Sequence, residues 1–200
     1  MKVGVLALQG DFREHIQTLR ELHADAFEVK TLEDLWRAEA LVIPGGESTT
    51  ISKLAIAFNL MEPIRKRIAD GLPTYGSCAG LIMLAREIKD PASGQETFGG
   101  LDIVVRRNAF GRQVDSFESD LAIKGIEGDP VRAIFIRAPW VESFGETVNV
   151  LASVEIDGQQ HPVAIQQGKV LATSFHPEIS GDNRVHRYFL EKICQKAYGA

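Results

Sequence analysis

The stretch that decides the fold is LPTYGSCAGLIMLA, residues 72–85, in which a short apolar run turns abruptly into a helical pattern. The range Leu72–Tyr75 predicts a short buried strand, and Ala79–Ala85 predicts the first turns of a buried helix. A G-x-C-x-G sequence at a strand-to-helix turn is the cysteine counterpart of a nucleophile elbow. The glycines suit this turn because a Cβ on either side of Cys78 would strike the neighbouring strand or helix.

The position of Cys78 also suits a nucleophile. A thiol at a helix N-terminus lies beside the positive end of the helix dipole and unpaired N–H groups, which favour the reactive thiolate over the thiol. The alternative is a buried structural cysteine, the usual state of a free cysteine. Because G-x-C-x-G is short and occurs by chance, the motif alone leaves both interpretations open.

Length and composition bound the remaining possibilities. Two hundred residues predict one domain spanning residues 1–200, large enough to bury a core without covalent staples. No apolar run is long enough to span a membrane, and the apolar start of the chain fits a first strand better than a signal sequence. The net charge of −5 and the lack of a basic run argue against nucleic-acid binding.

The chain has two cysteines, Cys78 and Cys194, in very different contexts. This usage predicts neither a disulfide framework nor a zinc site. We therefore expect a cytoplasmic protein with no metal and no cofactor.

Strand and helix patterns alternate through the first half of the chain. Helical spacing begins after Asp11, after Thr31, at Ile51 and again at Glu62. Apolar runs follow the first two of these segments and the last one. This alternation predicts an α/β fold with an open, mainly parallel twisted sheet flanked by helices. The expected strands are Lys2–Leu8, Ala26–Lys30, Ala40–Ile43 and Leu72–Tyr75.

The second half is β-rich. Asp157-Gly158 between two strand patterns is a strong hairpin signal. An amphipathic helix over Asn183–Ala197 closes the chain. The expected strands are Leu101–Arg106, Asp120–Lys124, Ala133–Arg137, Val150–Ile156, His161–Gln167 and Lys169–Phe175.

A cysteine nucleophile needs a base, and a group that orients the base. His176 ends a predicted buried strand, and Pro177 after it disfavours helix, so we expect an extended segment. Residues two apart in such a segment project to the same side, which brings Glu178 next to His176. Taken alone, His-Pro-Glu is better interpreted as a surface turn with an incidental histidine. Beside an elbow cysteine, it predicts a base and the group that orients it.

Four further histidines have other interpretations. His15 and His186 lie in helical patterns, where solvated or structural roles are expected, His23 is at a helix end and His161 belongs to the hairpin. They are therefore not the predicted base.

The segment Pro44–Thr50, PGGESTT, follows a predicted strand and precedes a helix. Its glycines expose backbone N–H groups that can stabilise a developing oxyanion. A phosphate cradle is the alternative, but no Gly-Lys-Ser/Thr follows, so the Walker interpretation fails. Ser48 or Thr49 as a helix cap is compatible with an oxyanion role.

With these segments in hand, the chain resembles the class I (triad) glutamine amidotransferases over essentially its whole length. Within them it is similar to the glutaminase subunits of two-component pyridoxal 5′-phosphate synthases. The cysteine and His-Pro-Glu motifs identify the superfamily, whereas GGESTT and FGRQVDSFE, residues 110–118, are more specific. The shared motifs are Leu8–Gly10 with Glu14-His15, Pro44–Thr50, Cys78–Gly80, Arg107-Asn108 with Phe110–Gln113, Ile136–Pro139 and His176–Glu178.

The resemblance implies hydrolysis of L-glutamine to glutamate and ammonia. Cys78 would attack the side-chain amide, His176 would protonate the leaving ammonia and then activate water, and Glu178 would orient His176. The backbone N–H groups of Gly46 and Ala79 would form the oxyanion hole. The implied substrate-binding residues are Gly46, Glu47, Ser48, Arg107, Ile136 and Arg137; an arginine suits the α-carboxylate of a free amino acid.

The resemblance also implies a partner, a (β/α)8 synthase subunit that receives the ammonia through a protein channel in a hetero-oligomeric complex. The glutaminase would stay weak until this partner orders the oxyanion loop, with Gln9 and Gly10 as contacts. Two alternatives remain: a stand-alone cysteine hydrolase or peptidase, active without a second protein, and a non-catalytic regulatory binder. An intact Cys-His-Glu set counts against the binder.

Overall fold

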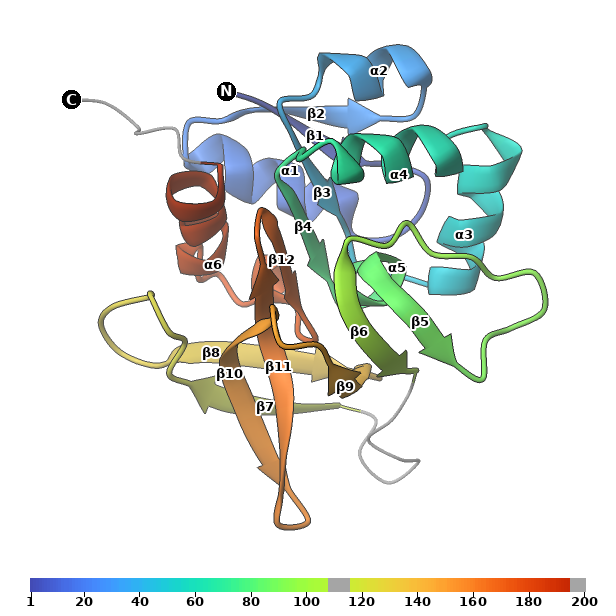
Figure 1. Cartoon of the computed structure of the whole chain (residues 1–200). Helices are drawn as coiled ribbons and strands as arrows, with labels where there is room; N and C mark the ends of the chain where they lie inside the picture. The colour runs from blue at the N-terminus through green and yellow to red at the C-terminus, as the bar shows by residue number, and fades with distance from the viewer. Residues whose placement is uncertain (108–115, 195–200) are drawn as a thin grey trace.

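The computed structural model of the chain describes residues 1–107 and 116–194. At its centre is a seven-stranded sheet (Figure 1). Its strands are β1 (Lys2–Leu6), β2 (Asp25–Val29), β3 (Ala40–Ile43), β4 (Thr74–Ser77), β10 (Asn149–Ile156), β11 (Gln159–Gln167) and β12 (Val170–Thr173). The spatial order is β10-β11-β12-β4-β3-β1-β2, so strands from both ends of the chain meet in the middle of the sheet.

The sheet is mainly parallel. The neighbours from β12 through β4, β3 and β1 to β2 all pair in parallel, while β11 pairs antiparallel with β12 and with β10. The four residues of β3 and of β4 are all buried, as in a parallel sheet covered on both faces. This arrangement and the strands of the second half confirm the fold class predicted from the sequence.

Each face of the sheet packs against its own hydrophobic cluster. One face is covered by α2 (Leu32–Arg37), α3 (Ser48–Ala57), α4 (Met61–Ala69), α5 (Ala79–Leu84) and a small sheet of β5 (Ala85–Lys89), β6 (Leu101–Arg106) and β9 (Trp140–Phe144). The other is covered by α1 (Phe12–Glu21), the antiparallel pair β7 (Ser116–Leu121) and β8 (Val131–Ile136), α6 (Arg184–Tyr188) and the π-helical turn η2 (Phe189–Ile193). Within the described ranges, no helix has the length and apolar character needed to cross a lipid bilayer.

The helix after Cys78 is shorter than predicted. It ends at Leu84, and Ala85 begins β5, which pairs with β6; the sequence predicts neither β5 nor β9. Arg86 and Glu87 are good helix formers, so local preference carries no signal for a strand there. Pairing with β6 overrides that preference, because strand formation depends on the neighbouring strand.

Two other elements differ from the expected ones, and the first of them, β7, also begins four residues earlier than expected, at Ser116. The strand expected at Asp120–Lys124 is β7, which ends at Leu121 because the chain turns at Gly125, where φ is +84° and the N–H of Ile126 donates to Ile123. The expected C-terminal helix begins at Arg184 and becomes π-helical at Phe189; residues 195–197 of that prediction lie outside the described residues. The other expected strands agree with the structure to within two residues at each end.

The parallel strands bring four loops to one edge of the sheet. β4 pairs with β3 on one side and with β12 on the other, so that Gly76 is opposite Ile43 and Ser77 is opposite Thr173. The loops after β1, β3, β4 and β12 leave from the carboxyl ends of these strands, where ligands bind in open α/β sheets. Cys78 and His176 therefore meet at this edge. The motif segments Leu8–Gly10 and Pro44–Thr50, which follow β1 and β3, lie there too.

Candidate active site

Cys78 occupies a strained turn between β4 and α5. Its backbone has φ 48° and ψ −102°, a left-handed conformation that side-chain-bearing residues adopt rarely and mainly at functional sites. The N–H of Cys78 donates to the carbonyl of Thr173 on β12, which fixes the turn to the neighbouring strand. A Cβ at Gly76 would come within 2.6 Å of Gly80, and one at Gly80 within 2.2 Å of the Ile43 carbonyl. These close approaches confirm the reason predicted for both glycines.

His176 and Glu178 lie together behind the elbow. The Nδ1 atom of His176 is 2.7 Å from Oε1 of Glu178, and both residues are buried. The segment is not extended as predicted, because Pro177–Ile179 forms a single 3-10 turn, η1. Proline fits the first position of such a turn, since its missing N–H would have no helical acceptor. The turn thus brings the carboxylate back toward the ring.

The environment of His176 favours its charged form. Burial lowers its pKa, but hydrogen bonding with Cys78 and with Glu178, and the charges of both, outweigh burial and raise the pKa to about 10. Burial raises the pKa of Glu178, and the hydrogen bond with His176 opposes that rise. At neutral pH His176 is therefore an imidazolium that lies between Cys78 and the carboxyl group of Glu178.

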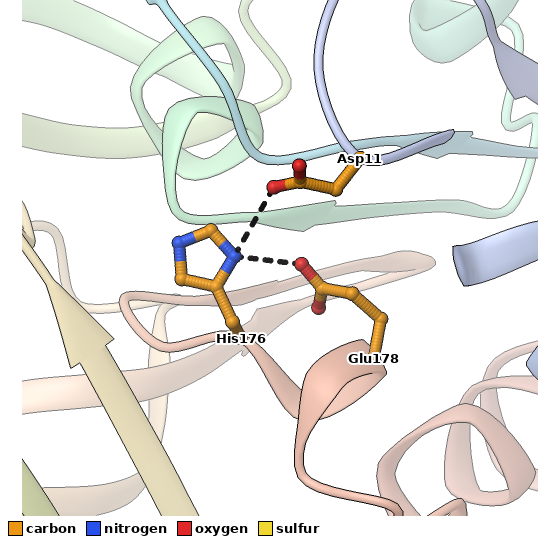
Figure 2. A group of neighbouring side chains, drawn as sticks. All are labelled: Asp11, His176 and Glu178. Carbon is orange, nitrogen blue, oxygen red and sulfur yellow. Dashed lines mark hydrogen bonds and ion pairs between the residues drawn. The ribbon is translucent and has the colours of Figure 1, made fainter. Parts of the chain in front are cut away.

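A second carboxylate, from the loop after β1, faces the same ring nitrogen. Oδ2 of Asp11 is 3.6 Å from Nδ1 of His176, and Figure 2 shows the other ring nitrogen pointing away from both carboxylates. Ligand atoms of Asp11, His176 and Glu178 lie within 4.8 Å of one another, close enough to surround a metal ion. A cation there would compete with the Nδ1 hydrogen bond that orients His176, so we assign the cluster to the imidazolium instead.

The Gly45–Gly46 turn packs directly against His176. A Cβ at Gly45 would lie 2.4 Å from Cε1 and 2.9 Å from Nδ1 of the ring. The Gly45 carbonyl accepts a hydrogen bond from the N–H of Asp11, and the N–H of Glu47 donates to Oε1 of Gln9. The loop after β1 therefore holds the turn by hydrogen bonds on both sides of Gly46.

A cavity of about 380 Å³ opens beside Cys78. The carbonyl of Ile136 is 3.9 Å from the Cys78 sulfur, and a guanidinium nitrogen of Arg107 is 3.9 Å from Oε1 of Glu47. Apart from Glu178, which is behind His176, every predicted site residue lines the cavity. The lining comprises Gln9, Asp11, Gly46, Glu47, Ser48, Cys78, Ala79, Ile82, Arg107, Ile136, Arg137 and His176. The motif residues Asn108 and Phe110–Gln113 lie outside the described residues.

The structure adds two residues that the sequence did not single out for this site. His15 and His186 are completely buried, which contradicts the solvated role considered for them. Nδ1 of His15 is 2.8 Å from Nε2 of His186, and Nε2 of His15 is 2.9 Å from Oγ of Ser77 and 3.5 Å from Oε2 of Glu178. The spacing of Phe12, His15 and Leu19 already placed His15 on the apolar face of its helix, and that signal predicts burial.

Comparison with known proteins agrees with this geometry. Residues 5–195 match the model of the SNO glutamine amidotransferase family. The chain is 59% identical over 191 residues to the pyridoxal 5′-phosphate synthase subunit PdxT of Streptomyces coelicolor, covering 96% of this chain and 93% of that protein. It is 57% identical over 194 residues to the subunit of the same name from Rhodococcus opacus, covering 96% of each.

Solved structures give the same result. A crystal structure of a glutamine amidotransferase superposes with a TM-score of 0.87 at 50% identity, covering 97% of this chain and 99% of that one. A glutamine amidotransferase from Thermotoga maritima, at 15% identity and a TM-score of 0.60, covers 98% and 86% and shares the fold. With a cysteine elbow, a buried His-Glu pair and a match along nearly its whole length, the chain belongs to the SNO glutamine amidotransferase family.

Proposed function

We propose that the protein hydrolyses L-glutamine to L-glutamate and ammonia, with Cys78, His176 and Glu178 as the catalytic triad. The observation that carries this proposal is the placement of Cys78 and His176 at the ends of the neighbouring strands β4 and β12, where both line one cavity and Nδ1 of His176 is 2.7 Å from the Glu178 carboxylate. Membership of the SNO glutamine amidotransferase family and the likeness to a solved glutamine amidotransferase support glutamine as the substrate.

The reaction proceeds through a γ-glutamyl thioester. The Cys78 thiolate attacks the side-chain amide carbon; as the C–N bond breaks, Nε2–H of His176 protonates the departing nitrogen, which leaves as ammonia. Neutral His176 then takes a proton from water, whose oxygen attacks the thioester and releases glutamate and the Cys78 thiolate. Glu178 accepts the Nδ1–H bond throughout, so it fixes the tautomer and orientation of the ring.

The oxyanion of each tetrahedral intermediate needs two N–H donors beside the sulfur. We assign them to Gly46 and Ala79, because both line the cavity next to Cys78 and Ala79 is the first residue of α5, whose N–H groups lack helical acceptors. The N–H of Glu47, the residue after Gly46, donates to Oε1 of Gln9. A partner that contacts the loop of Gln9 would therefore also change the position of the Gly46 N–H.

Glutamine occupies the cavity with its side-chain amide toward Cys78. Arg107 is the donor for the α-carboxylate, through a bidentate pair, and the nearby Glu47 carboxylate suits the α-ammonium group. The remaining substrate contacts are Gly46, Ser48, Ile136 and Arg137, all of which line the same cavity.

The ammonia is delivered to a (β/α)8 pyridoxal 5′-phosphate synthase subunit, for vitamin B6 synthesis, in a hetero-oligomeric complex. The relatives are named as subunits of that synthase, which supports a synthase partner for this chain. A protein channel suits the transfer, because ammonia released into water is protonated and loses its nucleophilicity. Gln9 and Gly10, beside the oxyanion turn, are the proposed contacts.

Residues 1–200 form one glutaminase domain in this proposal, which the central sheet supports by combining strands from both halves of the chain. A reducing compartment such as the cytoplasm suits the mechanism, since the Cys78 thiolate must stay reduced to act.

Ammonia release from glutamine, measured with and without a (β/α)8 synthase subunit from the same organism, tests the proposal. We expect hydrolysis that rises when the synthase is added and is absent from Cys78→Ala in both conditions. Glutamine hydrolysis retained by Cys78→Ala would disprove the nucleophile. Equal activity without the synthase, or turnover of peptides, would favour a stand-alone hydrolase, and no turnover at all would favour a non-catalytic binder.

A further inference from the structure

The carboxylate of Glu178 has two oxygens in different situations. Oε1 is bonded to His176, whereas Oε2 is completely buried and has no hydrogen-bond partner among the described residues. A buried carboxylate oxygen without a donor is unfavourable, because its hydration has been lost without replacement. The group that faces Oε2 is the imidazole of His15, whose Nε2 is 3.5 Å away.

His15 is held from the opposite side by His186. The two rings contact each other through Nδ1 of His15 and Nε2 of His186, which are 2.8 Å apart. Tyr75 packs edge-on against both rings, with centroid distances of 6.0 Å to His15 and 5.7 Å to His186. Burial lowers the pKa of His15 well below its usual value and that of His186 to about 4, so both rings are neutral.

Two neutral histidines joined in this way have two tautomer arrangements. In the first, Nδ1–H of His15 donates to His186; the proton of His186 is then on Nδ1, which has no acceptor in the described structure, and a lone pair of His15 faces Glu178. In the second, Nε2–H of His186 donates to Nδ1 of His15, and Nε2–H of His15 points toward Ser77 and Glu178. The second is favoured, because a buried orphan N–H is rarer than an orphan acceptor and because N–H, not a lone pair, then faces the carboxylate.

From this geometry we propose that His15 is a positioning residue for the triad: its Nε2–H, fixed in that tautomer by His186 and hydrogen-bonded to Oγ of Ser77, lies 3.5 Å from Oε2 of Glu178 and holds that carboxylate in line with His176 by electrostatic attraction. This role rests on the proposed glutaminase function. His15 belongs to α1, does not line the substrate cavity and touches no reacting atom, so it acts only through Glu178.

The kinetic test compares two substitutions at one position. His15→Gln keeps an N–H near the place of Nε2, whereas His15→Leu removes it. We expect His15→Leu to lower kcat for glutamine hydrolysis by the synthase complex roughly 10- to 100-fold, the usual range for residues that orient a functional ligand. The KM for glutamine stays unchanged, and His15→Gln recovers most of the loss.

The control is Ile16→Ala, the next residue of the same helix, which is buried in the hydrophobic cluster and outside the site. It weakens the packing of α1 without removing a group that faces Glu178, so kcat should remain at the parent value. If Ile16→Ala lowered kcat as much as His15→Leu, or if His15→Gln gave no recovery, the effect would be one of packing and the proposal would be wrong.

A spectroscopic test does not depend on activity. Long-range proton–nitrogen NMR of the histidine rings, in the full chain, reports the tautomer of each neutral ring. We expect a proton on Nε2 of both His15 and His186, and a low-field Nδ1–H signal of His176 that persists in His15→Gln and shifts or broadens in His15→Leu. A proton on Nδ1 of His15, or a His176 signal indifferent to His15→Leu, would overturn the proposal.

The two tests also separate this inference from the proposed function. If the parent complex released no ammonia, the glutaminase assignment would fail, while the NMR spectra would still decide whether His15 holds Glu178. If the parent is active and the Nδ1–H signal of His176 is the same in His15→Leu as in the parent, the proposed function stands and the positioning role of His15 is wrong.

Discussion

Two histidines flank the same carboxylate, and they differ in charge. His176 and His15 face opposite oxygens of Glu178, and burial lowers the pKa of each. For His176 the acidic neighbours Cys78 and Glu178 outweigh burial, whereas the further neighbours that affect His15 are the histidines 186 and 176, which lower its pKa again. The comparison teaches that the charge of the neighbouring groups, and not the depth of burial, decides the protonation of each ring. His176 is a charged acid, and His15 is a neutral ring that positions Glu178.

The largest expected effect comes from removing the charged ring. We expect His176→Asn to lower kcat for glutamine hydrolysis about 10³-fold or more, because neither protonation of ammonia nor activation of water remains. The measurement is ammonia release by the complex with its synthase subunit. The matched control is His23→Asn, an exposed position with φ 60° that asparagine tolerates, and it should keep parental activity. Full activity of His176→Asn would remove the ring from the mechanism.

Glu178→Gln removes the negative charge of the carboxylate that lies between His176 and His15. The amide is isosteric but neutral, so the imidazolium loses one of the two groups that raise its pKa. We expect kcat to fall on the order of 10²-fold and the pKa of His176, followed by NMR titration of its ring, to drop below the parental value. His15 should remain neutral in this variant. An unchanged His176 pKa would show that Cys78 alone sets it.

Gly45→Ala tests whether the position of the His176 ring matters, because it changes the packing around the ring without altering any charge. The new Cβ would lie 2.4 Å from the ring of His176, so the ring must turn away from Glu178 and Cys78. We expect about a tenfold loss of kcat, measured as ammonia release. Gly71→Ala is the control. Nothing lies within 4 Å of its Cβ, so kcat should stay parental, while the positive φ of 91° costs about 1–2 kcal/mol of stability. Equal losses in both variants would point to stability rather than to the ring.

The last expected effect is on stability and not on kcat, and it has opposite signs for the two kinds of histidine. The folded pKa of His186, about 4, is below the unfolded value of 6.5, so the unfolded chain binds more protons between these values. Its contribution is complete above pH 6.5 and is lost as the pH falls to about 4. We expect the free energy of unfolding to fall by up to ~1.4 kcal/mol per pH unit for such a group in that window, and His15 adds to the slope.

His176 contributes in the other direction. Its folded pKa of about 10 exceeds the unfolded value, so its contribution is complete below pH 6.5 and is lost as the pH rises through 10. Urea unfolding between pH 4.5 and 7 measures the acid limb. His186→Gln, which does not titrate, should flatten that limb; an equally steep limb in His186→Gln would assign it to other groups.

Much of this site could be predicted from the sequence. The elbow around Cys78 and the glycine turn at Gly45 could be predicted because each consists of adjacent residues. In both, the conformation that the residues favour agrees with the chemistry that they supply. The pairing of His176 with Glu178 was correct, although a 3-10 turn and not an extended strand brings them together. The strand β5 was not predictable, because its helix-forming residues become a strand only by pairing with β6.

Contacts between segments that are distant in the sequence could not be predicted either. Asp11 and His15 precede the base by more than 160 positions in the sequence, and nothing local relates them to Glu178. Only the register of the parallel strands brings α1 against η1. The apolar spacing of the first helix predicts that His15 is buried, but which carboxylate it faces is a property of the tertiary structure.

The pairing of β4 with β12 has a consequence for how the newly made chain acquires activity. Tyr75 and Thr173 on these strands are in contact although they are 98 residues apart in the sequence. Closing so long a loop costs entropy before the contacts compensate for it, so we expect this pairing to form late in folding. During synthesis the elbow cysteine emerges long before its histidine and glutamate do. We therefore expect a nascent or truncated chain that lacks β12 to carry the thiol without hydrolysing glutamine.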